Sequence, residues 1–177
     1  TAARHGFGDI AEGGCRHGAA IVIASAVTLG ETFSMDTSSA GRNASSNSTE
    51  SSRPRFILIV DDETPIIRSL TREISPWAEA NGYAVSGTVI GRTALEFIEE
   101  HRDAVDLVIA DIRMPGMSGG DMALEIRKRY PDIKIIVLTA YNDTKEIRKA
   151  EQAGISSFMT KPWDSHELIH EIEQALG

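Results

Sequence analysis

The chain has 177 residues, of which 41% are hydrophobic and 25% charged, a balance typical of one globular domain with an appendage. Its net charge of -8 repels phosphates, so we expect no direct binding to nucleic acids. The apolar run at residues 19–27 is too short to cross a bilayer, and Cys15 is the only cysteine in the sequence. We therefore expect no membrane partner, no internal disulfide and a cytoplasmic location.

The N-terminal part differs in composition from the rest of the chain. Ser, Thr and Asn supply 12 of the 19 residues from Ser34 to Ser52, which is typical of a segment that cannot bury enough surface to fold. We predict that residues 1–53 form a disordered, low-complexity extension or a non-native leader, and that residues 54–177 form the folded domain. Met35 is a hypothetical natural start, because the composition of a folded domain begins only near Arg53.

From residue 55 onward, short apolar segments alternate with longer segments of helical period. Five strands are predicted, at residues 56–60, 83–88, 106–110, 134–139 and 156–160. The first, third and fourth are nearly continuous runs of Val, Ile and Leu, as expected of central strands covered on both faces. This order predicts an α/β fold, a single doubly wound (βα)5 domain with a parallel sheet.

Each predicted helix begins at a residue that suits an N-cap. These residues are Thr64, Thr93, Ser118, Asp143 and Asp164. Gly82 and Gly154 mark two helix ends, where a left-handed residue is common. Pro76 lies inside the first helix and predicts a kink or an early end near Ser75, because its ring removes a backbone donor.

Polar side chains follow the strands at the edge where an open parallel sheet forms its binding crevice. Asp61 and Asp62 follow the first strand, Asp111 follows the third, Thr139 ends the fourth, and Lys161 follows the fifth. Alone, each is a common turn, strand-end or surface residue. Together, carboxylates without Cys or His favour Mg²⁺, and a neighbouring lysine and hydroxyl favour phosphoryl transfer. Asp111 is the best candidate nucleophile, because it ends the central apolar strand.

Four motifs carry a family resemblance: IVDDE at residues 59–63, DIRMPGMSG at 111–119, VLTA at 137–140 and FMTKP at 158–162. In this order and spacing they resemble the response-regulator receiver domain of two-component signalling, as found in chemotaxis regulators, over about residues 56–176. The resemblance implies a flavodoxin-like strand order of 2-1-3-4-5. It also implies a phosphoprotein that acts in a phosphorelay.

The resemblance assigns roles to the acidic residues. Asp111 is the phosphoacceptor, which takes a phosphoryl group from a phosphohistidine on a sensor histidine kinase or a histidine phosphotransfer protein. Asp62 and Asp111 bind Mg²⁺ directly, together with the backbone carbonyl of Arg113. Asp61 holds a water at the metal. These roles agree with the charge of the site, because a cation offsets repulsion among carboxylates.

The resemblance also assigns the residues that respond to the phosphoryl group. Thr139 and Lys161 contact its oxygens, and a cis peptide between Lys161 and Pro162 directs the lysine toward the pocket. Movement of Thr139 is coupled to an aromatic side chain on the fifth strand, which is Phe158 here. Simple core packing is an equally good reading of Phe158, which also lacks the hydroxyl of the tyrosine often found at this position.

Three alternatives stay open or are discounted at this stage. A phosphatase of the haloacid-dehalogenase type is discounted, because its nucleophile follows the first strand in an Asp-x-Asp pattern. A non-phosphorylated docking receiver, and a receiver fragment of a larger hybrid kinase or multidomain regulator, stay open. The resemblance implies a signalling switch rather than a metabolic enzyme. The resemblance also implies two contact surfaces. The first helix would contact the kinase, and the fourth helix, fifth strand and fifth helix would contact an unknown target or a homodimer partner.

Overall fold

The computed structural model describes residues 55–140 and 144–177. The predicted extension at residues 1–53, with Cys15 and Met35, lies outside the described residues, as does the capping residue Asp143. Strands and helices alternate along the chain as β1 (Arg55–Val60), α1 (Thr64–Ala80), β2 (Tyr83–Thr88), α2 (Gly91–Glu100), β3 (Val105–Asp111), α3 (Gly119–Arg129), β4 (Lys134–Thr139), α4 (Thr144–Gln152), β5 (Ser157–Thr160) and α5 (Ser165–Leu176).

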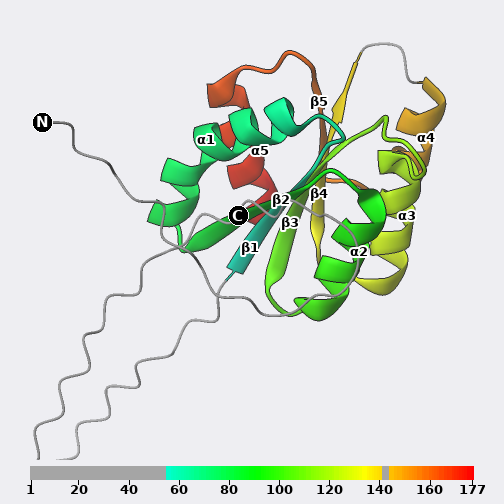
Figure 1. Ribbon diagram of the computed structural model, residues 1–177, viewed down its shortest axis with the longest axis horizontal. Helices are drawn as coiled ribbons and strands as arrows, with labels where there is room; N and C mark the ends of the chain where they lie inside the picture. The colour runs from blue at the N-terminus through cyan, green and yellow to red at the C-terminus, as the bar shows by residue number, and fades with distance from the viewer. Residues whose placement is uncertain (1–54, 141–143) are drawn as a thin grey trace, which may run out of the picture.

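The five strands form one parallel sheet in the order β2-β1-β3-β4-β5, which confirms the predicted flavodoxin-like order (Figure 1). The three apolar strands β1, β3 and β4 are central, as predicted. In the register, Val60 pairs with Ala110, Asp111 with Leu138, and Thr139 with Thr160. The carboxyl ends of four strands therefore meet at one edge of the sheet.

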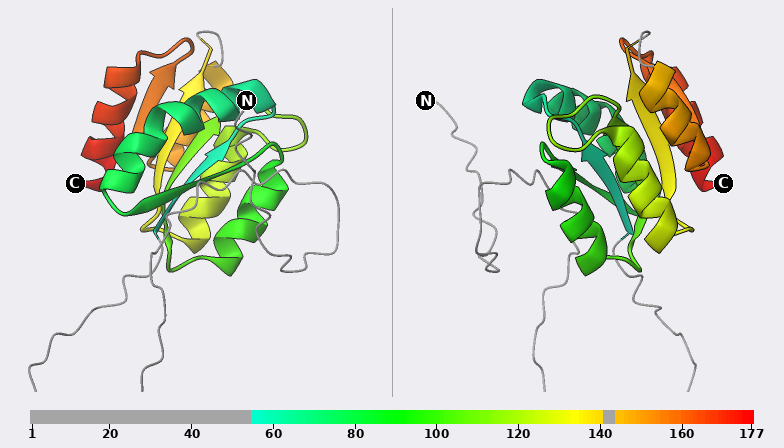
Figure 2. Two further views of the ribbon diagram at one scale, coloured as in Figure 1. Left: turned by 60° about the vertical axis from the view of Figure 1, so that its left-hand side comes forward. Right: turned by 90° about the vertical axis from the view of Figure 1, so that its right-hand side faces the viewer.

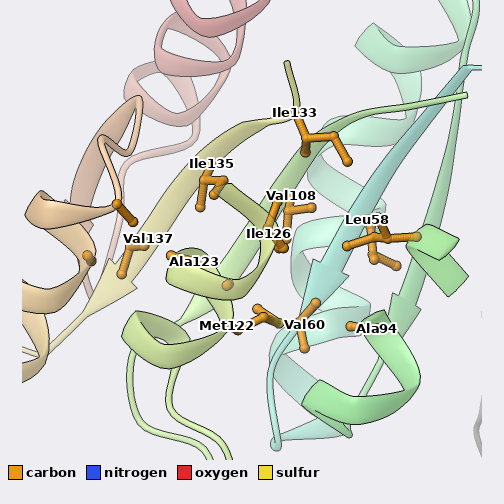
Figure 3. Close-up of a cluster of buried hydrophobic side chains, with 14 of the residues drawn as sticks. Leu58, Val60, Ala94, Val108, Met122, Ala123, Ile126, Ile133, Ile135 and Val137 are labelled. Atoms are coloured by element: carbon orange, nitrogen blue, oxygen red, sulfur yellow. The ribbon is translucent and has the colours of Figure 1, made fainter. Parts of the chain in front are cut away.

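Helices cover both faces of the sheet. Figures 1 and 2 show α1 and α5 on one face and α2, α3 and α4 on the other. Alternate residues of β1 point into different cores: Ile57 and Ile59 pack with α1 and α5, and Leu58 and Val60 pack with α2 and α3. Figure 3 shows the second of these cores. Because both faces are buried, the ends of the central strands are held rigidly.

Two predicted helix caps are confirmed. The Ser118 side chain accepts a hydrogen bond from the Asp121 backbone N–H at the start of α3. The Asp164 side chain accepts from the backbone N–H groups of His166 and Glu167 at the start of α5. Each interaction satisfies backbone donors that the first helical turn leaves without a partner.

Two other predicted caps are wrong, because backbone hydrogen bonds close the first turn earlier than the side-chain pattern indicates. Thr64 is the first residue of α1, and the preceding residue, Glu63, accepts from the Ile67 N–H. Thr93 lies inside α2, which begins at Gly91 after Ile90. The predicted helix ends are confirmed: Gly82 follows α1 with φ of 78° and Gly154 follows α4 with φ of 62°.

Of the kink or early end that Pro76 predicted near Ser75, the early end is wrong, because α1 continues through Pro76 to Ala80. Ile74 and Ala78 are buried on either side of the proline. Their packing against the sheet outweighs the one backbone hydrogen bond that the ring removes. In residues 55–140 and 144–177, no helix has the length and apolar composition needed to span a bilayer.

Candidate functional site

Three of the predicted site residues meet at the carboxyl edge of the sheet. Asp61 follows β1 and is fully buried, and Asp111 is the last residue of β3 and is 6% exposed. Lys161 follows β5, and its Nζ lies 2.6 Å from Asp61 Oδ2 and 2.6 Å from Asp111 Oδ1. One ammonium group therefore joins two buried carboxylates from neighbouring strands.

Backbone donors hold both carboxylates in place. The Glu63 N–H donates to Asp61 Oδ1 at 2.9 Å, and the Arg113 N–H donates to Asp111 Oδ2 at 2.8 Å. In each case the donor lies two residues after the aspartate, where the chain turns out of the strand. Hydrogen bonds from N–H groups favour the ionised carboxylate and fix its orientation.

Burial and pairing oppose each other at this edge. Burial raises the pKa of Asp61 above its ordinary value, although the hydrogen bonds from Lys161 and Glu63 act in the opposite direction. Burial alone lowers the pKa of Lys161, but its hydrogen bonds with Asp111 and Asp61 outweigh that effect, so the net pKa is raised. Lys161 is therefore cationic at neutral pH and supplies the positive charge that the buried carboxylates need.

The remaining site residues surround this cluster. Asp62 is exposed beside Asp61. Thr139 ends β4, is 4% exposed, and donates from Oγ1 to the Ala140 carbonyl at 3.0 Å. Phe158 lies on β5 and packs, partly buried, against the core under α2, α3 and α4. The peptide between Lys161 and Pro162 is cis, which confirms that prediction.

The donor atoms at this edge suit a hard divalent cation. Asp62 and Asp111 offer carboxylate oxygens, and Arg113 offers a backbone carbonyl. Across the described parts of the chain, no three His, Cys, Asp or Glu side chains are already arranged to hold a metal ion. Mg²⁺ does not need such a group, because it typically takes one or two carboxylates and completes its shell with waters and phosphate oxygens. The residues present therefore fit Mg²⁺.

The backbone around Asp111 is tied to β4 and to α3. The Ile112 N–H donates to the Leu138 carbonyl at 2.8 Å, and the Gly119 N–H donates to the Ile112 carbonyl at 3.0 Å. A methyl group at Gly119 would lie 2.2 Å from the Asp111 carbonyl oxygen. The start of α3 thus lies against the end of β3 in a way that only glycine permits. Sequence reasoning missed this role of Gly119, because the contact joins two elements of the fold.

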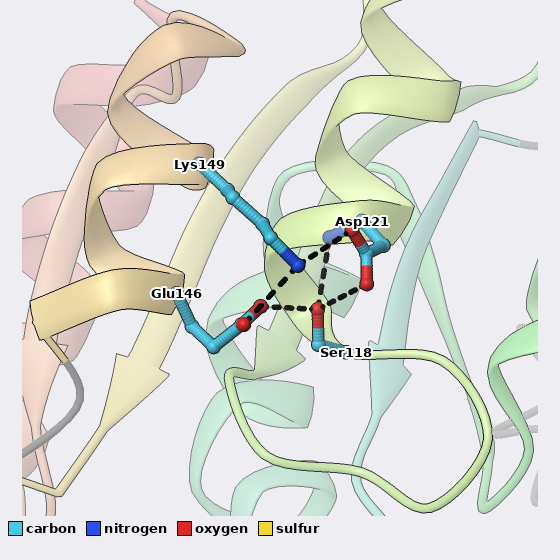
Figure 4. Close-up of polar contacts among 4 residues, drawn as sticks. All are labelled: Ser118, Asp121, Glu146 and Lys149. Carbon is cyan, nitrogen blue, oxygen red and sulfur yellow. Dashed lines mark hydrogen bonds and ion pairs between the residues drawn. The ribbon is translucent and has the colours of Figure 1, made fainter.

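A polar network joins the same start of α3 to α4 (Figure 4). Ser118 Oγ contacts Asp121 Oδ2 at 2.8 Å and Glu146 Oε2 at 2.5 Å. Lys149 Nζ lies 2.9 Å from Asp121 Oδ1 and 3.1 Å from Glu146 Oε1. The sequence pattern identified Ser118 only as a helix-start residue. The network itself was not predicted, because it depends on the packing of α3 against α4.

Comparisons with known proteins agree with this geometry. The response regulator receiver domain family matches residues 57–173. Transcriptional regulatory protein GlrR of Escherichia coli is 35% identical over 126 residues, which cover 71% of this chain and 27% of GlrR. Response regulator MprA of Mycolicibacterium vanbaalenii is 34% identical over 116 residues, which cover 66% of this chain and 48% of MprA. The chain thus spans less than half the length of these two relatives.

A solved structure supports the same conclusion. The signal receiver domain of an HD domain-containing protein from Pseudomonas fluorescens is 33% identical, with a TM-score of 0.64, and the match covers 70% of this chain and 95% of that one. The fold of this chain and its four sequence motifs thus agree with the family match over most of the described residues. The chain therefore belongs to the response regulator receiver domain family of two-component systems.

Proposed function

We propose that this receiver accepts a phosphoryl group on Asp111 from a phosphohistidine, carried by a sensor histidine kinase or a histidine phosphotransfer protein. The observation that supports this most strongly is the position of Lys161, whose Nζ lies 2.6 Å from both Asp61 and Asp111. A fixed cation beside a rigidly held carboxylate suits a reaction that brings further negative charge to the site.

The bond changes in the proposed transfer balance. An Asp111 carboxylate oxygen forms a bond to phosphorus while the bond from phosphorus to the imidazole nitrogen breaks. The electron pair of the broken bond stays on the departing imidazole, whose other nitrogen carries the proton that keeps it neutral. Lys161 offsets charge on the phosphoryl oxygens, and the Thr139 hydroxyl turns from the Ala140 carbonyl to donate to one of them.

In this proposal Asp62, Asp111 and the Arg113 backbone carbonyl hold Mg²⁺, and Asp61 holds a water beside it. When bound, Mg²⁺ offsets the charge that accumulates between the carboxylates and the phosphoryl oxygens. Asp61 and Asp111 share one lysine and Asp62 follows Asp61 in the chain, so the site already carries excess negative charge before a phosphoryl group arrives. Lys161 alone does not balance that charge.

The output of the proposed reaction is a change of shape. A phosphoryl group adds about −1.5 to −2 charge, which gives the Thr139 hydroxyl a stronger acceptor than the Ala140 carbonyl. Movement of Thr139 then changes the space available to Phe158 on the adjacent strand, since Val137 of β4 pairs with Phe158 of β5. We place the surface that signals this change, to an unknown target or to a second copy, on α4, β5 and α5.

We also propose a context for the receiver within its protein. Residues 54–177 form the receiver and residues 1–53 an extension to it, in a cytoplasmic protein. The receiver acts as a switch that catalyses only its own phosphorylation and dephosphorylation, rather than as a metabolic enzyme. Because the chain spans less than half of GlrR and MprA, a larger regulator or a hybrid kinase is an alternative context for the same chemistry.

The test is phosphorylation of the purified chain by a small-molecule phosphodonor. We expect a phosphoryl adduct in the intact mass of the wild type with Mg²⁺, and none with a chelator or in Asp111→Asn. Asp106→Asn is the matched control, because Asp106 lies on the same strand and is bound to Arg55 away from the site. A wild type that stays unmodified while folded and supplied with Mg²⁺ would show that this receiver is a docking module.

A further inference from the structure

A groove of about 740 Å³ runs between α2 and α3, and the residues that line it come from these two helices and from the β3–α3 loop. Figure 2 shows these two helices side by side on one face of the sheet. The apolar side chains that line the groove are Leu95, Met117 and Leu124. Leu124 is 37% exposed, and among the described residues only one other large hydrophobic side chain, Ile90, is exposed. The groove therefore presents apolar surface that its own domain leaves uncovered.

The rim of this α2–α3 groove is acidic. Its charged lining residues are five acids, Glu96, Glu99, Glu100, Asp121 and Glu125, and two bases, Arg92 and Arg129. Arg129 is already engaged, at 2.7 Å from Glu125 and 3.8 Å from Glu99. Within the part of the chain that the structure describes, Glu96 and Glu100 have no ion-pair partner. The rim thus holds negative charge that the domain does not neutralise.

We propose that the α2–α3 groove binds a basic amphipathic helix of a partner protein. Apolar side chains at helical spacing would cover Leu95, Met117 and Leu124, and flanking Lys or Arg side chains would pair with Glu96 and Glu100. An acidic rim repels the phosphates of nucleic acids and of anionic membranes, which leaves a protein segment as the occupant.

Charge also argues against the two occupants that this chain itself could supply. A second copy would bring the same acidic rim against this one, and each chain carries a net charge of -8. The 54 residues before β1 contain four Arg and no Lys against five acids, so they are not a basic segment. A basic partner is therefore the complement that the rim selects.

The groove is adjacent to the loop that carries the proposed phosphoacceptor. Met117 lies in the segment between Asp111 and α3, and its side chain packs beside Gly91 at the start of α2. Asp121 also lies on the rim, and it belongs to the network with Ser118 and Lys149. A bound helix would therefore contact the β3–α3 loop directly, while leaving the surfaces of α1 and α5 free.

The test uses a helical peptide of about 14 residues made of leucine and lysine, with the leucines at helical spacing. It is titrated into the full isotope-labelled chain, and backbone amide shifts are followed by NMR. We expect the shifts to concentrate in α2 and α3. We also expect Leu124→Ser to weaken binding about threefold, and the double variant Glu96→Gln/Glu100→Gln to weaken it about threefold.

The charge-matched control is the double variant Glu151→Gln/Glu171→Gln, which removes two acids from α4 and α5. We expect this variant to bind the peptide as the wild type does. Equal weakening by both double variants would overturn the proposal, because it would show attraction to the net charge alone. Shifts of the groove amides that follow protein concentration without peptide would also overturn it, by showing that a second copy is the occupant.

Discussion

The close approach of α3 to the end of β3 predicts that Gly119→Ala damages both stability and phosphorylation. The added methyl group would lie 2.2 Å from the Asp111 carbonyl oxygen and 3.0 Å from the Ile112 Cα. These are backbone atoms, so no side-chain rotation relieves the contact. Restoring the 3.4 Å of ordinary contact requires a displacement of at least about 1.2 Å at the start of α3 or at the end of β3.

This displacement sets the expected magnitudes. Overpacking of this kind costs about 1–3 kcal/mol of unfolding free energy, which is reduced by the better helix propensity of alanine. Because Asp111 is the residue displaced, the rate of phosphorylation should also fall, by up to about 100-fold for a misplacement near 1 Å. Loss of stability and loss of rate therefore have one cause. Urea unfolding and the time course of the phosphoryl adduct by intact mass measure the two effects.

Gly91→Ala is the matched control, because it makes the same chemical change at the first residue of α2. There a methyl group would meet only the Met117 side chain, at 3.5 Å, which is ordinary contact. We expect its stability to stay within about 1 kcal/mol of the wild type, with the same phosphorylation rate. If Gly119→Ala matched Gly91→Ala in both assays, the reasoning about the contact with Asp111 would be refuted.

Three further predictions follow from other contacts. Gly120→Ala places a methyl group 2.9 Å from the Glu146 carbonyl oxygen of α4, so it should cost about 1 kcal/mol in urea unfolding and shift α4 amides in NMR spectra. Hydrogen bonds lower the pKa of Glu73 despite its burial, so the stabilising effect of its charge is present above pH ~4.3 and lost as pH falls. The unfolding free energies of the wild type and of Glu73→Gln should therefore become equal in acid. Lys161→Ala leaves the buried Asp61 without its cation, so we expect a loss of about 1–3 kcal/mol at pH ~7 without divalent cations.

Each of these predictions has a contrary outcome. Unchanged α4 amides in Gly120→Ala would mean that α3 and α4 separate without strain. A gap between wild type and Glu73→Gln that is constant with pH would show that the charge of Glu73 does not stabilise the fold. Lys161→Ala removes the hydrogen bond and the charge that lower the pKa of the buried Asp61, so the folded variant binds protons more tightly than the wild type and its stability deficit should grow as pH rises. A deficit that does not shrink in acid would contradict the pairing with Asp61.

Much of the fold was predictable because apolar runs identify strands that are buried on both faces. Residues 83–88 and 134–139 match β2 and β4 at both ends; β1 and β5 differ from prediction by one residue at one end, and β3 by one residue at each end. Helix starts were less predictable, because Thr64 and Thr93 have capping chemistry but lie inside helices. The backbone carbonyls of Glu63 and Ile90 accept the first hydrogen bonds of those helices, so the helices begin at or before the predicted caps. Capping propensity of about 1 kcal/mol is too small to override tertiary packing.

The chemistry of the site was more predictable than its support. Asp61, Asp111 and Lys161 were expected together because each lies at the carboxyl end of a strand in one parallel sheet. Their exact partners were not, because hydrogen bonds from Glu63 and Arg113 depend on how the chain turns after each strand. The α2–α3 groove was also not predicted, since it depends on the spacing of two helices that are unremarkable in sequence.

Two adjacent glycines lie between the proposed phosphorylation site and the proposed output surface on α4. Gly119 lets the start of α3 lie against the Asp111 backbone, and Gly120 lets the same turn lie against the Glu146 backbone in α4. We expect a displacement at Asp111 to reach α4 through this helical turn, which Ser118 also fastens, since its Oγ accepts from the Asp121 N–H and donates to the Glu146 carboxylate. Closely packed backbones transmit small displacements because neither side can yield alone. This route does not pass through Thr139 or Phe158, so we expect it to remain when the aromatic side chain of Phe158 is removed.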